Sequence, residues 1–386
     1  MKQVLQDRKG LTVVRDVPAP ACAPGSVLVR TAYSAISSGT ERSRVELSQK
    51  SLVGKARERP DLVREVVDRA RREGLKKTVD TVQRKLADET AVGYSCAGRV
   101  VEVGGAVADV VPGDLVACAG AGHANHAAVV SVPANLCARV PGDVPLSAAA
   151  LTTIAAIALH GLRLADVSLG DRVAVIGCGL VGQIACRLLS SAGAEVFALD
   201  IDARRAAAAG ADHALGVDEA ARESVARATG GVGVDRVLVT AASSTSEPLV
   251  LGAQLARDRG TVVLVGDVKV DVPRAPFYMK ELSFRISRSY GPGRYDAEYE
   301  ERGLDYPVGY VRWTEKRNMA AILSLQARGR LRLEDLVEET FPVSRAEEAY
   351  ARLMGPPEQR PRGAVLLSYA DEDGAAPVGA PARPTA

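Results

Sequence analysis

The sequence is poor in the residues that build metal centres. It has 4 histidines in 386 residues, and only His123 and His126 lie close together along the chain. Its 6 cysteines are scattered, with no C-x-x-C pair and no histidine at the spacing of a metal site. We therefore expect reduced, mostly buried thiols and no metal site.

The chain also lacks long hydrophobic runs and a strong charge of either sign. No apolar run reaches the ~18 residues of a membrane-spanning helix, and the N-terminal MKQVLQDRKGLTVV lacks the apolar core of a signal peptide. The formal net charge of +2 argues against a dedicated nucleic-acid-binding protein. These absences favour a cytoplasmic protein with neither a nucleic-acid nor a membrane partner.

Hydrophobic patterning divides the chain into two parts, as expected because a single core rarely grows beyond about 250–300 residues. Short β-branched runs between Gly, Pro and Asp turns fill residues 1–40 and 91–140 and predict a small β-barrel or sandwich. From about residue 151, strand-like and helix-like runs alternate, which predicts an α/β fold with a doubly wound parallel sheet.

Two segments stand apart from these parts. The charge-rich residues 45–90 have helical apolar spacing and are interpreted as a solvated helical hairpin or subunit-contact arm, with a lid as the alternative. The Pro/Ala/Gly-rich tail 371–386 is predicted to be disordered.

The segment VAVIGCGLVGQ carries a dinucleotide-binding fingerprint. Gly177, Gly179 and Gly182 have G-x-G-x-x-G spacing between a buried strand and a helix, and Asp200 ends the next strand. The glycines permit a tight turn, backbone approach to a pyrophosphate, and close helix–strand packing, while the helix N-terminus favours the anion. The predicted cofactor contacts are Gly177, Gly179, Leu180, Val181, Gly182, Asp200 and Gly266, the last of which ends the strand-like run GTVVLVG.

The acid at the end of the second strand also bears on cofactor choice. Asp200 would accept hydrogen bonds from ribose hydroxyls and repel a 2′-phosphate, which favours NAD(H). Arg204 and Arg205 follow closely and could hold that phosphate instead. We therefore expect NAD(H) to be preferred, with NADP(H) as the alternative.

A barrel-like part, a Rossmann unit and a returning C-terminal segment together resemble the medium-chain dehydrogenase/reductase superfamily over about residues 1–370. A closer likeness is to the threonine-dehydrogenase-like module of bacterial bi-domain oxidoreductases. The stretches that carry it are SSGTERS, SLVGKARERPDLV, GYSCAG, ANHAAVVSVPANLC and SYGPGRYDAEYEERGLDYPVGYVRWTEKRN. The resemblance implies a GroES-like β-barrel catalytic domain at 1–150 and 291–370 and a Rossmann dinucleotide-binding domain at 151–290. It also implies a homodimer or homotetramer formed through the edge of the Rossmann sheet.

The resemblance further bears on zinc. In zinc members, a Cys-Gly-Thr-Asp motif and a Gly-His-Glu motif each supply a metal ligand. Here SGTE at 38–41 and GYS at 93–95 stand at those places, so Ser38 replaces the cysteine and Tyr94 the histidine. The third-ligand region, PLSAAALTTIAA, has no Cys, His or carboxylate. Because neutral hydroxyls are poor zinc ligands, we expect a zinc-free member.

A zinc-free dehydrogenase needs another group to handle the hydroxyl proton, and the resemblance offers three. Thr40 matches the proton-relay Ser/Thr, Tyr94 could donate to a carbonyl oxygen, and Glu41 could act as a base or hold Tyr94 in place. The alternatives are that Tyr94 fills the former metal pocket and that Glu41 pairs with a nearby arginine.

Further positions are assigned by the same resemblance. Thr153 is expected near the nicotinamide, and the backbone of Ser289 and Tyr290 near its carboxamide, with packing at the domain junction as the alternative. Residues 290–313 hold half of the 10 tyrosines and the only tryptophan, which fits a substrate-lining or subunit-contact segment. The remaining candidate substrate contacts are Ser38, Asn125, His126, Tyr295 and Arg312.

These features predict a zinc-independent NAD(P)-dependent oxidoreductase that interconverts a secondary alcohol and a ketone. From the resemblance, its small-molecule substrate is expected to be polar, such as a sugar, cyclitol or nucleoside-like metabolite. The alternatives are an NAD(P)H-dependent reductase of a conjugated C=C bond, a non-catalytic NAD(P)-binding sensor, and an enzyme that recycles its bound cofactor.

Overall fold

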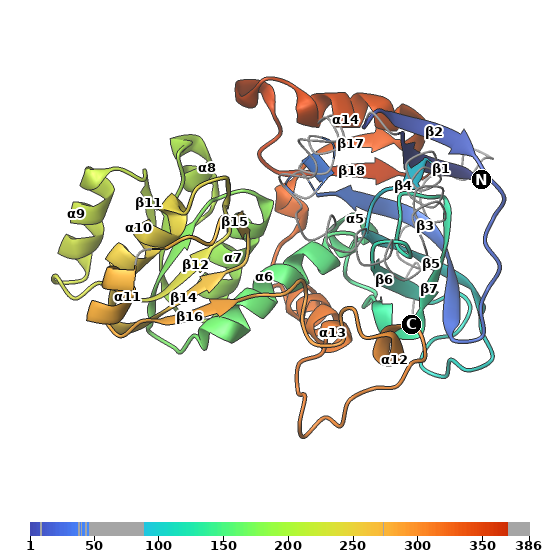
Figure 1. Ribbon diagram of the computed structural model, residues 1–386. Coiled ribbons are helices and arrows are strands. Elements are labelled where there is room, and N and C mark those ends of the chain that lie inside the picture. The colour runs from blue at the N-terminus through green and yellow to red at the C-terminus, as the bar shows by residue number, and fades with distance from the viewer. Residues whose placement is uncertain are drawn as a thin grey trace, which may run out of the picture.

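The computed structural model describes residues 1–7, 10–37, 39, 41–42, 45, 89–272 and 274–369, arranged as two lobes (Figure 1). Most of the segment 45–90 and all of the tail 371–386 lie outside the described residues, so the predictions for them remain predictions. No helix in the described ranges is long and apolar enough to cross a membrane.

A seven-stranded, mostly antiparallel sheet forms the first lobe. Its strand order is β17-β18-β3-β5-β6-β8, and β7 pairs with β3. The strands are β3 (Ser26–Ile36), β5 (Ser95–Val103), β6 (Leu115–Ala119), β7 (Val129–Pro133), β8 (Cys137–Arg139), β17 (Val337–Pro342) and β18 (Ala364–Ser368). A smaller sheet adds β1 (Lys2–Gln6), β2 (Thr12–Asp16) and β4 (Thr90–Ala91). Gly98 permits the close approach of β3 and β5, because a Cβ there would meet the Arg30 carbonyl oxygen at 2.0 Å.

The second lobe is a six-stranded parallel sheet. Its strands are β9 (Arg172–Ile176), β10 (Glu195–Leu199), β11 (His213–Leu215), β12 (Val234–Val239), β14 (Ala256–Leu264) and β16 (Ser283–Ile286). They lie in the order β11-β10-β9-β12-β14-β16, which is the 3-2-1-4-5-6 order of a Rossmann sheet. The central run VAVI is wholly buried, as expected for a strand covered on both faces. The prediction of a doubly wound parallel sheet beside a β-rich lobe is therefore confirmed.

Helices complete both lobes. Those of the Rossmann lobe are α7 (Leu180–Ser191), α8 (Ala203–Ala208), α9 (Glu219–Ala228), α10 (Glu247–Leu255) and α11 (Arg274–Met279). The other lobe carries α5 (Leu146–Ala149), α12 (Ala297–Glu300) and α14 (Ala346–Met354). A two-stranded sheet of β13 (Ala242–Ser243) and β15 (Asp267–Val268) lies beyond the Rossmann strands.

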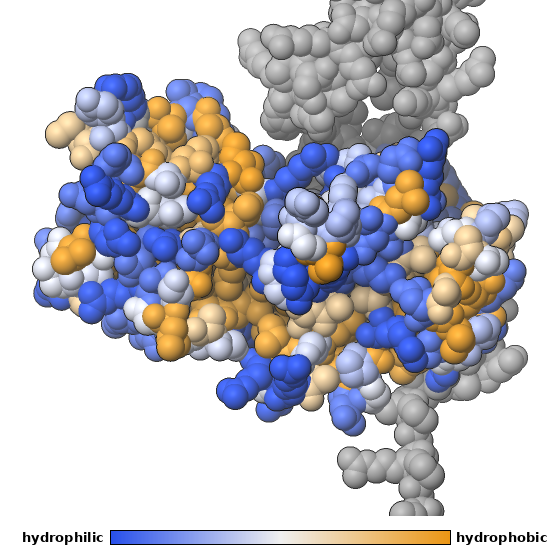
Figure 2. Space-filling view, turned by 90° about the horizontal axis from the view of Figure 1, so that it is seen from below, coloured by the Kyte–Doolittle hydropathy of each residue, from blue (hydrophilic) through white to orange (hydrophobic). Residues whose placement is uncertain are grey.

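Two helices join the lobes. The buried face of α6 (Thr152–Ala165) packs against α7 on the Rossmann side and against α13 (Glu315–Ala327) on the other. One hydrophobic core runs through this junction, from Val29 in β3 to Val175 in β9. Seen from below, hydrophobic residues gather where the lobes meet, with hydrophilic residues on either side (Figure 2). The residue limits proposed for the two domains remain a prediction.

Candidate active site

The glycine-rich turn after β9 has the geometry of a dinucleotide-binding loop. Gly177 has φ +99°, and a Cβ there would meet the Ala241 nitrogen at 2.5 Å. A Cβ on Gly182 would meet the Gly177 carbonyl oxygen at 2.0 Å, so this position needs glycine for α7 to pack against β9. The space around Gly179, the N-cap of α7, is open within 4 Å. The first helical residues, Leu180 and Val181, therefore follow a turn whose backbone N–H groups can meet an anion.

Asp200 lies against this turn, directly after β10. Its carboxylate is buried and accepts hydrogen bonds from the N–H groups of Cys178 (2.7 Å) and Asp202 (2.8 Å). Each oxygen thus has one backbone donor, and a carboxylate can accept about four hydrogen bonds in all. The group both fixes the glycine-rich turn and keeps capacity for ribose hydroxyls.

The two arginines on α8 differ in their partners. Arg204 is exposed and forms an ion pair with Asp202, with 3.0 Å between Nε and Oδ1. Arg205 has a buried Nε without a hydrogen-bond partner among the described residues. Burial raises the pKa of the Cys178 thiol and the Arg205 charge lowers it, so this guanidinium lies within electrostatic reach of the glycine-rich turn. Arg205 is thus the arginine with an unused donor beside the adenosine end of the proposed site.

Other predicted cofactor contacts meet at the same edge of the sheet. Gly266 follows β14, and a Cβ there would meet the Ala241 carbonyl oxygen at 2.0 Å, so the turns after β12 and β14 nearly touch. Ser289 and Tyr290 follow β16, with Ser289 at φ +55°. Because the strands are parallel, their carboxyl ends bring these turns together with Gly177 and Asp200.

At the N-terminus of α6, the Thr153 hydroxyl, which the sequence analysis expects near the nicotinamide, already has a hydrogen-bond partner. Thr153 Oγ1 donates to the Cys118 carbonyl, at 3.2 Å. Its neighbour Thr152 is also fully buried, and its Oγ1 lacks a hydrogen-bond partner in the described part of the chain. Sequence reasoning missed Thr152, because adjacent threonines at a helix start cannot be told apart without the packing.

The AVGYSCAG segment leads into β5, and its residues differ in role. Gly93 has φ +93°, and a Cβ there would meet His126 Cγ at 2.7 Å. Ser95 is buried and donates to the Ala150 carbonyl at 2.6 Å. Tyr94 lies between them, half-buried against the core, and its carbonyl accepts the N–H of Gly120 at 3.0 Å. Gly93 and Ser95 are therefore structural, and Tyr94 between them keeps part of its surface open.

Glu41 belongs to a buried polar network in the β-rich lobe. Its carboxylate accepts the Ser37 N–H at 3.0 Å, lies 3.3 Å from His126 Nε2, and accepts a hydrogen bond from the Tyr350 hydroxyl. His126 Nδ1 lies 2.7 Å from Ser34 Oγ, which in turn lies 2.9 Å from the Tyr369 hydroxyl. We call these five side chains, Ser34, Glu41, His126, Tyr350 and Tyr369, the barrel network. Its members come from β3 (Ser34), the segment after β3 (Glu41), the loop before β7 (His126), α14 (Tyr350) and the residue after β18 (Tyr369).

The remaining predicted residues lie in several places. Asn125 Oδ1 accepts the N–H of Gly122 at 3.1 Å and shapes the loop before His126. Tyr295 is 62% exposed, and Arg312 lies over the ring of Trp313 at 3.8 Å. Ser38 and Thr40 lie outside the described residues. The structure thus brings the cofactor set together, while the roles proposed toward substrate stay predictions.

The donor set does not fit a zinc site in the part of the chain that the structure describes. No group of three His, Cys, Asp or Glu side chains there is placed to hold a metal ion. The sulfurs of Cys118 and Cys137 lie 3.8 Å apart in the core. Hydrogen bonding to Cys137 and Cys96, with burial, raises the pKa of the Cys118 thiol, which disfavours the thiolate that zinc requires.

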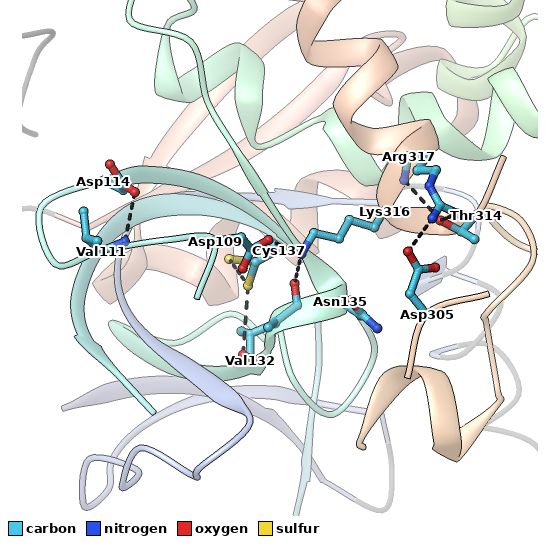
Figure 3. Close-up of polar contacts among 12 residues, drawn as sticks. Asp109, Val111, Asp114, Val132, Asn135, Cys137, Asp305, Thr314, Lys316 and Arg317 are labelled. Carbon is cyan, nitrogen blue, oxygen red and sulfur yellow. Dashed lines mark hydrogen bonds and ion pairs between the residues drawn. The ribbon is translucent and has the colours of Figure 1, made fainter. Parts of the chain in front are cut away.

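A cavity of about 380 Å³ lies beside the start of α13. Its two cationic side chains are paired: Lys316 Nζ donates to Asp109 at 2.6 Å and to the Ala134 carbonyl at 2.8 Å, and Arg317 donates to Asp305 (Figure 3). The positive charges that line this cavity are therefore neutralised by two aspartates of the same lining, Asp109 and Asp305. A larger cavity, of about 610 Å³, opens near Lys280 at the amino ends of β12 and β14, opposite the predicted cofactor edge.

The chain is similar in sequence to known dehydrogenases and to part of a polyketide synthase system protein. Residues 181–302 match the family model of zinc-binding dehydrogenases, a range that includes neither Tyr94 nor residues 38–41. The spectinabilin polyketide synthase system protein NorB of Streptomyces orinoci is 34% identical over 304 residues, which cover 73% of this chain and 13% of that protein. The D-guloside 3-dehydrogenase of Escherichia coli is 28% identical over 284 residues, covering 72% of this chain and 76% of that one.

Solved structures share the fold. The galactitol-1-phosphate dehydrogenase of Escherichia coli superposes with a TM-score of 0.72 and 19% identity, covering 95% of this chain and 100% of that one. At that identity the likeness concerns the two-lobed architecture alone. It places the β-rich lobe, the Rossmann lobe and the returning C-terminal strands in one arrangement in both proteins.

Proposed function

Because the chain belongs to the medium-chain dehydrogenase/reductase superfamily, we propose that it is a zinc-independent, NAD(P)-dependent oxidoreductase. It interconverts a secondary alcohol and a ketone on a polar, sugar-, cyclitol- or nucleoside-like metabolite. The observation that carries the proposal is the cofactor edge, where the glycine-rich turn, Asp200 and the turns after β12, β14 and β16 converge.

The cofactor edge fits a dinucleotide. The N-terminus of α7 offers backbone N–H groups to a pyrophosphate, and Gly179 leaves room for its approach. The Asp200 carboxylate can accept hydrogen bonds from the ribose hydroxyls, which favours NAD(H). The Arg205 guanidinium could instead donate to a 2′-phosphate. A nicotinamide cofactor held by these residues would supply hydride transfer to or from the substrate carbon.

The proton is handled on the side of the β-rich lobe. We assign the donor role to Tyr94, which is half-buried and stands where zinc relatives place a metal ligand. Glu41 acts as a positioning residue, since its carboxylate and N–H both bond to the backbone of Ser37 and fix the ends of the segment that contains Thr40. Thr40 itself is assigned as a proton relay from the family resemblance alone.

The substrate class is supported by one relative above all. The D-guloside 3-dehydrogenase of Escherichia coli is named for oxidation of a sugar derivative, and this chain spans 76% of its length. A polar substrate also suits the junction of the lobes, where tyrosines and arginines are concentrated between residues 288 and 313.

Metal content and cofactor binding are measured first, in one preparation. The purified chain is analysed for metals by mass spectrometry and titrated with NADH and NADPH by fluorescence. We expect far less than one zinc per chain and saturable binding of NADH. One zinc per chain would overturn the zinc independence and leave the cofactor assignment intact.

Turnover separates the proposed reaction from its alternatives. Polyols and secondary alcohols are supplied with NAD⁺ or NADP⁺, and 2-cyclohexenone with NADH or NADPH. Oxidation of the alcohols supports the proposal, whereas reduction of the enone alone points to a C=C reductase. Tyr94→Phe keeps the ring and removes the hydroxyl, so we expect kcat to fall by about 100-fold. An unchanged kcat would remove Tyr94 from the proton path.

A further inference from the structure

Two buried polar side chains without partners among the described residues lie within electrostatic reach of each other at the junction of the lobes. Glu315, the first residue of α13, is 0% exposed, and neither carboxyl oxygen has a hydrogen-bond partner among the described residues. Tyr290, just past β16, is 2% exposed, and within the same ranges its hydroxyl has no partner either. Leaving such groups unsatisfied is costly, so each calls for an occupant.

The surroundings keep the Glu315 carboxyl neutral. Burial, with the nearby Glu300 carboxylate adding to it, raises the pKa of Glu315 to about 9, and Arg294 opposes the shift. Arg294 is already committed to Glu300, with 2.6 Å between Nη1 and Oε1 and both side chains about one-tenth exposed. At neutral pH Glu315 is therefore a carboxylic acid, with an O–H donor and a C=O acceptor.

The pair is rigidly placed beside the cofactor edge. The Tyr290 carbonyl accepts Asn318 Nδ2 at 2.9 Å, and Asn318 Oδ1 accepts Arg163 Nε at 2.8 Å from α6. The N–H of Glu315 donates to the Pro292 carbonyl at 2.8 Å, which ties α13 to the turn that follows Tyr290. The end of β16, α6 and α13 thus hold both side chains in one place.

Arg294 and Tyr295 lie beside Tyr290 in the turn that follows it. The Arg294 guanidinium lies 5.7 Å from the Tyr290 ring centroid and 4.0 Å from that of Tyr295, which is 62% exposed. Gly291 and Gly293 flank the turn at φ +123° and +105°. Since Glu315 and Tyr290 are both buried, a ligand reaches them only if neighbouring side chains such as Arg294 move.

We propose that Glu315 and Tyr290 form a subsite for the hydroxyl groups of a polyhydroxylated substrate. The inference rests on the proposed function and names the part of the site that selects polyols. A vicinal diol offers two donors and two acceptors, which match a neutral carboxyl and a phenol. An anionic ligand would find no free cation here, because Arg294 is already paired with Glu300, and an apolar ligand would leave both polar groups unpaired.

The test uses xylitol and D-sorbitol as polyol probes and 2-butanol as the monohydroxy probe. Glu315→Leu and Tyr290→Phe are expected to raise the KM for the polyols about tenfold or more relative to the KM for 2-butanol. Glu315→Gln keeps a neutral donor and acceptor and should retain polyol selectivity. Gln326→Leu is the matched control, since Gln326 lies on the same helix and also has unpaired buried amide atoms within the described ranges.

Binding measurements separate the subsite from the reaction. Polyol affinity is measured by calorimetry on the NADH-saturated protein, which needs no turnover. Weaker xylitol binding in Glu315→Leu supports the subsite even where no alcohol is oxidised, a result that would remove the proposed function alone. Normal turnover with unchanged polyol affinity and KM in both variants would overturn the subsite and identify the occupant as an enclosed water only.

Discussion

Arg204 and Arg205 are neighbours on α8 that differ in whether a guanidinium N–H donor already has a partner. The Arg204 guanidinium is engaged with Asp202, whereas Arg205 Nε is buried without a described partner. Arg205→Ala should therefore weaken NADPH binding by about tenfold, the loss of one charge-assisted hydrogen bond, with little effect on NADH. Fluorescence titration measures both dissociation constants, with Arg204→Ala as the matched control. Equal losses in the two variants would mean that charge alone, and not the unpaired donor, affects cofactor choice.

Glu315 should also leave a signature in stability. Its pKa is raised from about 4.5 to about 9, so between these pH values the folded chain keeps a proton that the unfolded chain releases. The stabilisation is present in full below about pH 4.5 and is lost as pH rises through about 9. Over that range the free energy of unfolding of the natural chain should fall, relative to Glu315→Gln, by up to about 1.4 kcal/mol per pH unit.

Urea unfolding from pH 5 to 9 checks this prediction. Glu301→Gln serves as the control, because it removes an exposed acid from the segment between Tyr290 and Glu315. Its free energy of unfolding should follow the same pH dependence as that of the natural chain. Parallel curves for Glu315→Gln as well would show that Glu315 is ionised in the folded state. The proposed neutral carboxyl would then be wrong.

At the scale of elements, the barrel network ties α14 to β3. Tyr350→Phe removes the hydroxyl that donates to the buried Glu41 carboxylate and leaves that oxygen short of a donor. We expect a loss of about 1–3 kcal/mol in the free energy of unfolding. Tyr278→Phe, on an exposed ring of α11, should cost less than about 0.5 kcal/mol. Equal losses of unfolding free energy in Tyr350→Phe and Tyr278→Phe, measured by urea unfolding, would show that the Tyr350 hydrogen bond adds no stability.

The elements also show why sequence reasoning succeeded at the cofactor edge. A strand, a glycine turn and a helix follow one another within VAVIGCGLVGQ, so local pattern and local structure coincide there. The family resemblance drawn from the motifs is confirmed by the matched family model and relatives. The barrel network joins side chains far apart along the chain, such as Glu41 and Tyr350, and no periodicity relates them. Glu315 was missed because its charged segment RWTEKRN reads as solvated until packing turns the one carboxyl inward.

At the scale of the whole molecule, the edge of the Rossmann sheet formed by β16 exposes apolar side chains. β16 pairs only with β14 in the described structure, and large apolar side chains on and near it are exposed, including Ile286 (62%) and Met279 (77%). An open, apolar edge strand is a template for pairing with another chain. The family resemblance predicts that a second copy covers this edge, and the homo-oligomer remains a prediction.

A charge placed on that edge should separate the copies. Ile286→Asp puts a carboxylate where two β16 strands would meet, and burying it unpaired would cost several kcal/mol, enough to shift a micromolar or tighter dimer to monomer. Light scattering after size exclusion measures the mass directly. Leu11→Asp changes a comparably exposed residue before β2, in the other lobe, and should leave the mass of the natural chain unchanged. A monomeric natural chain, or an Ile286→Asp variant of dimer mass, would place the subunit contact elsewhere. Because the proposed polyol subsite lies just beyond the same strand, loss of pairing should also raise the polyol KM if the contact steadies the turn after Tyr290.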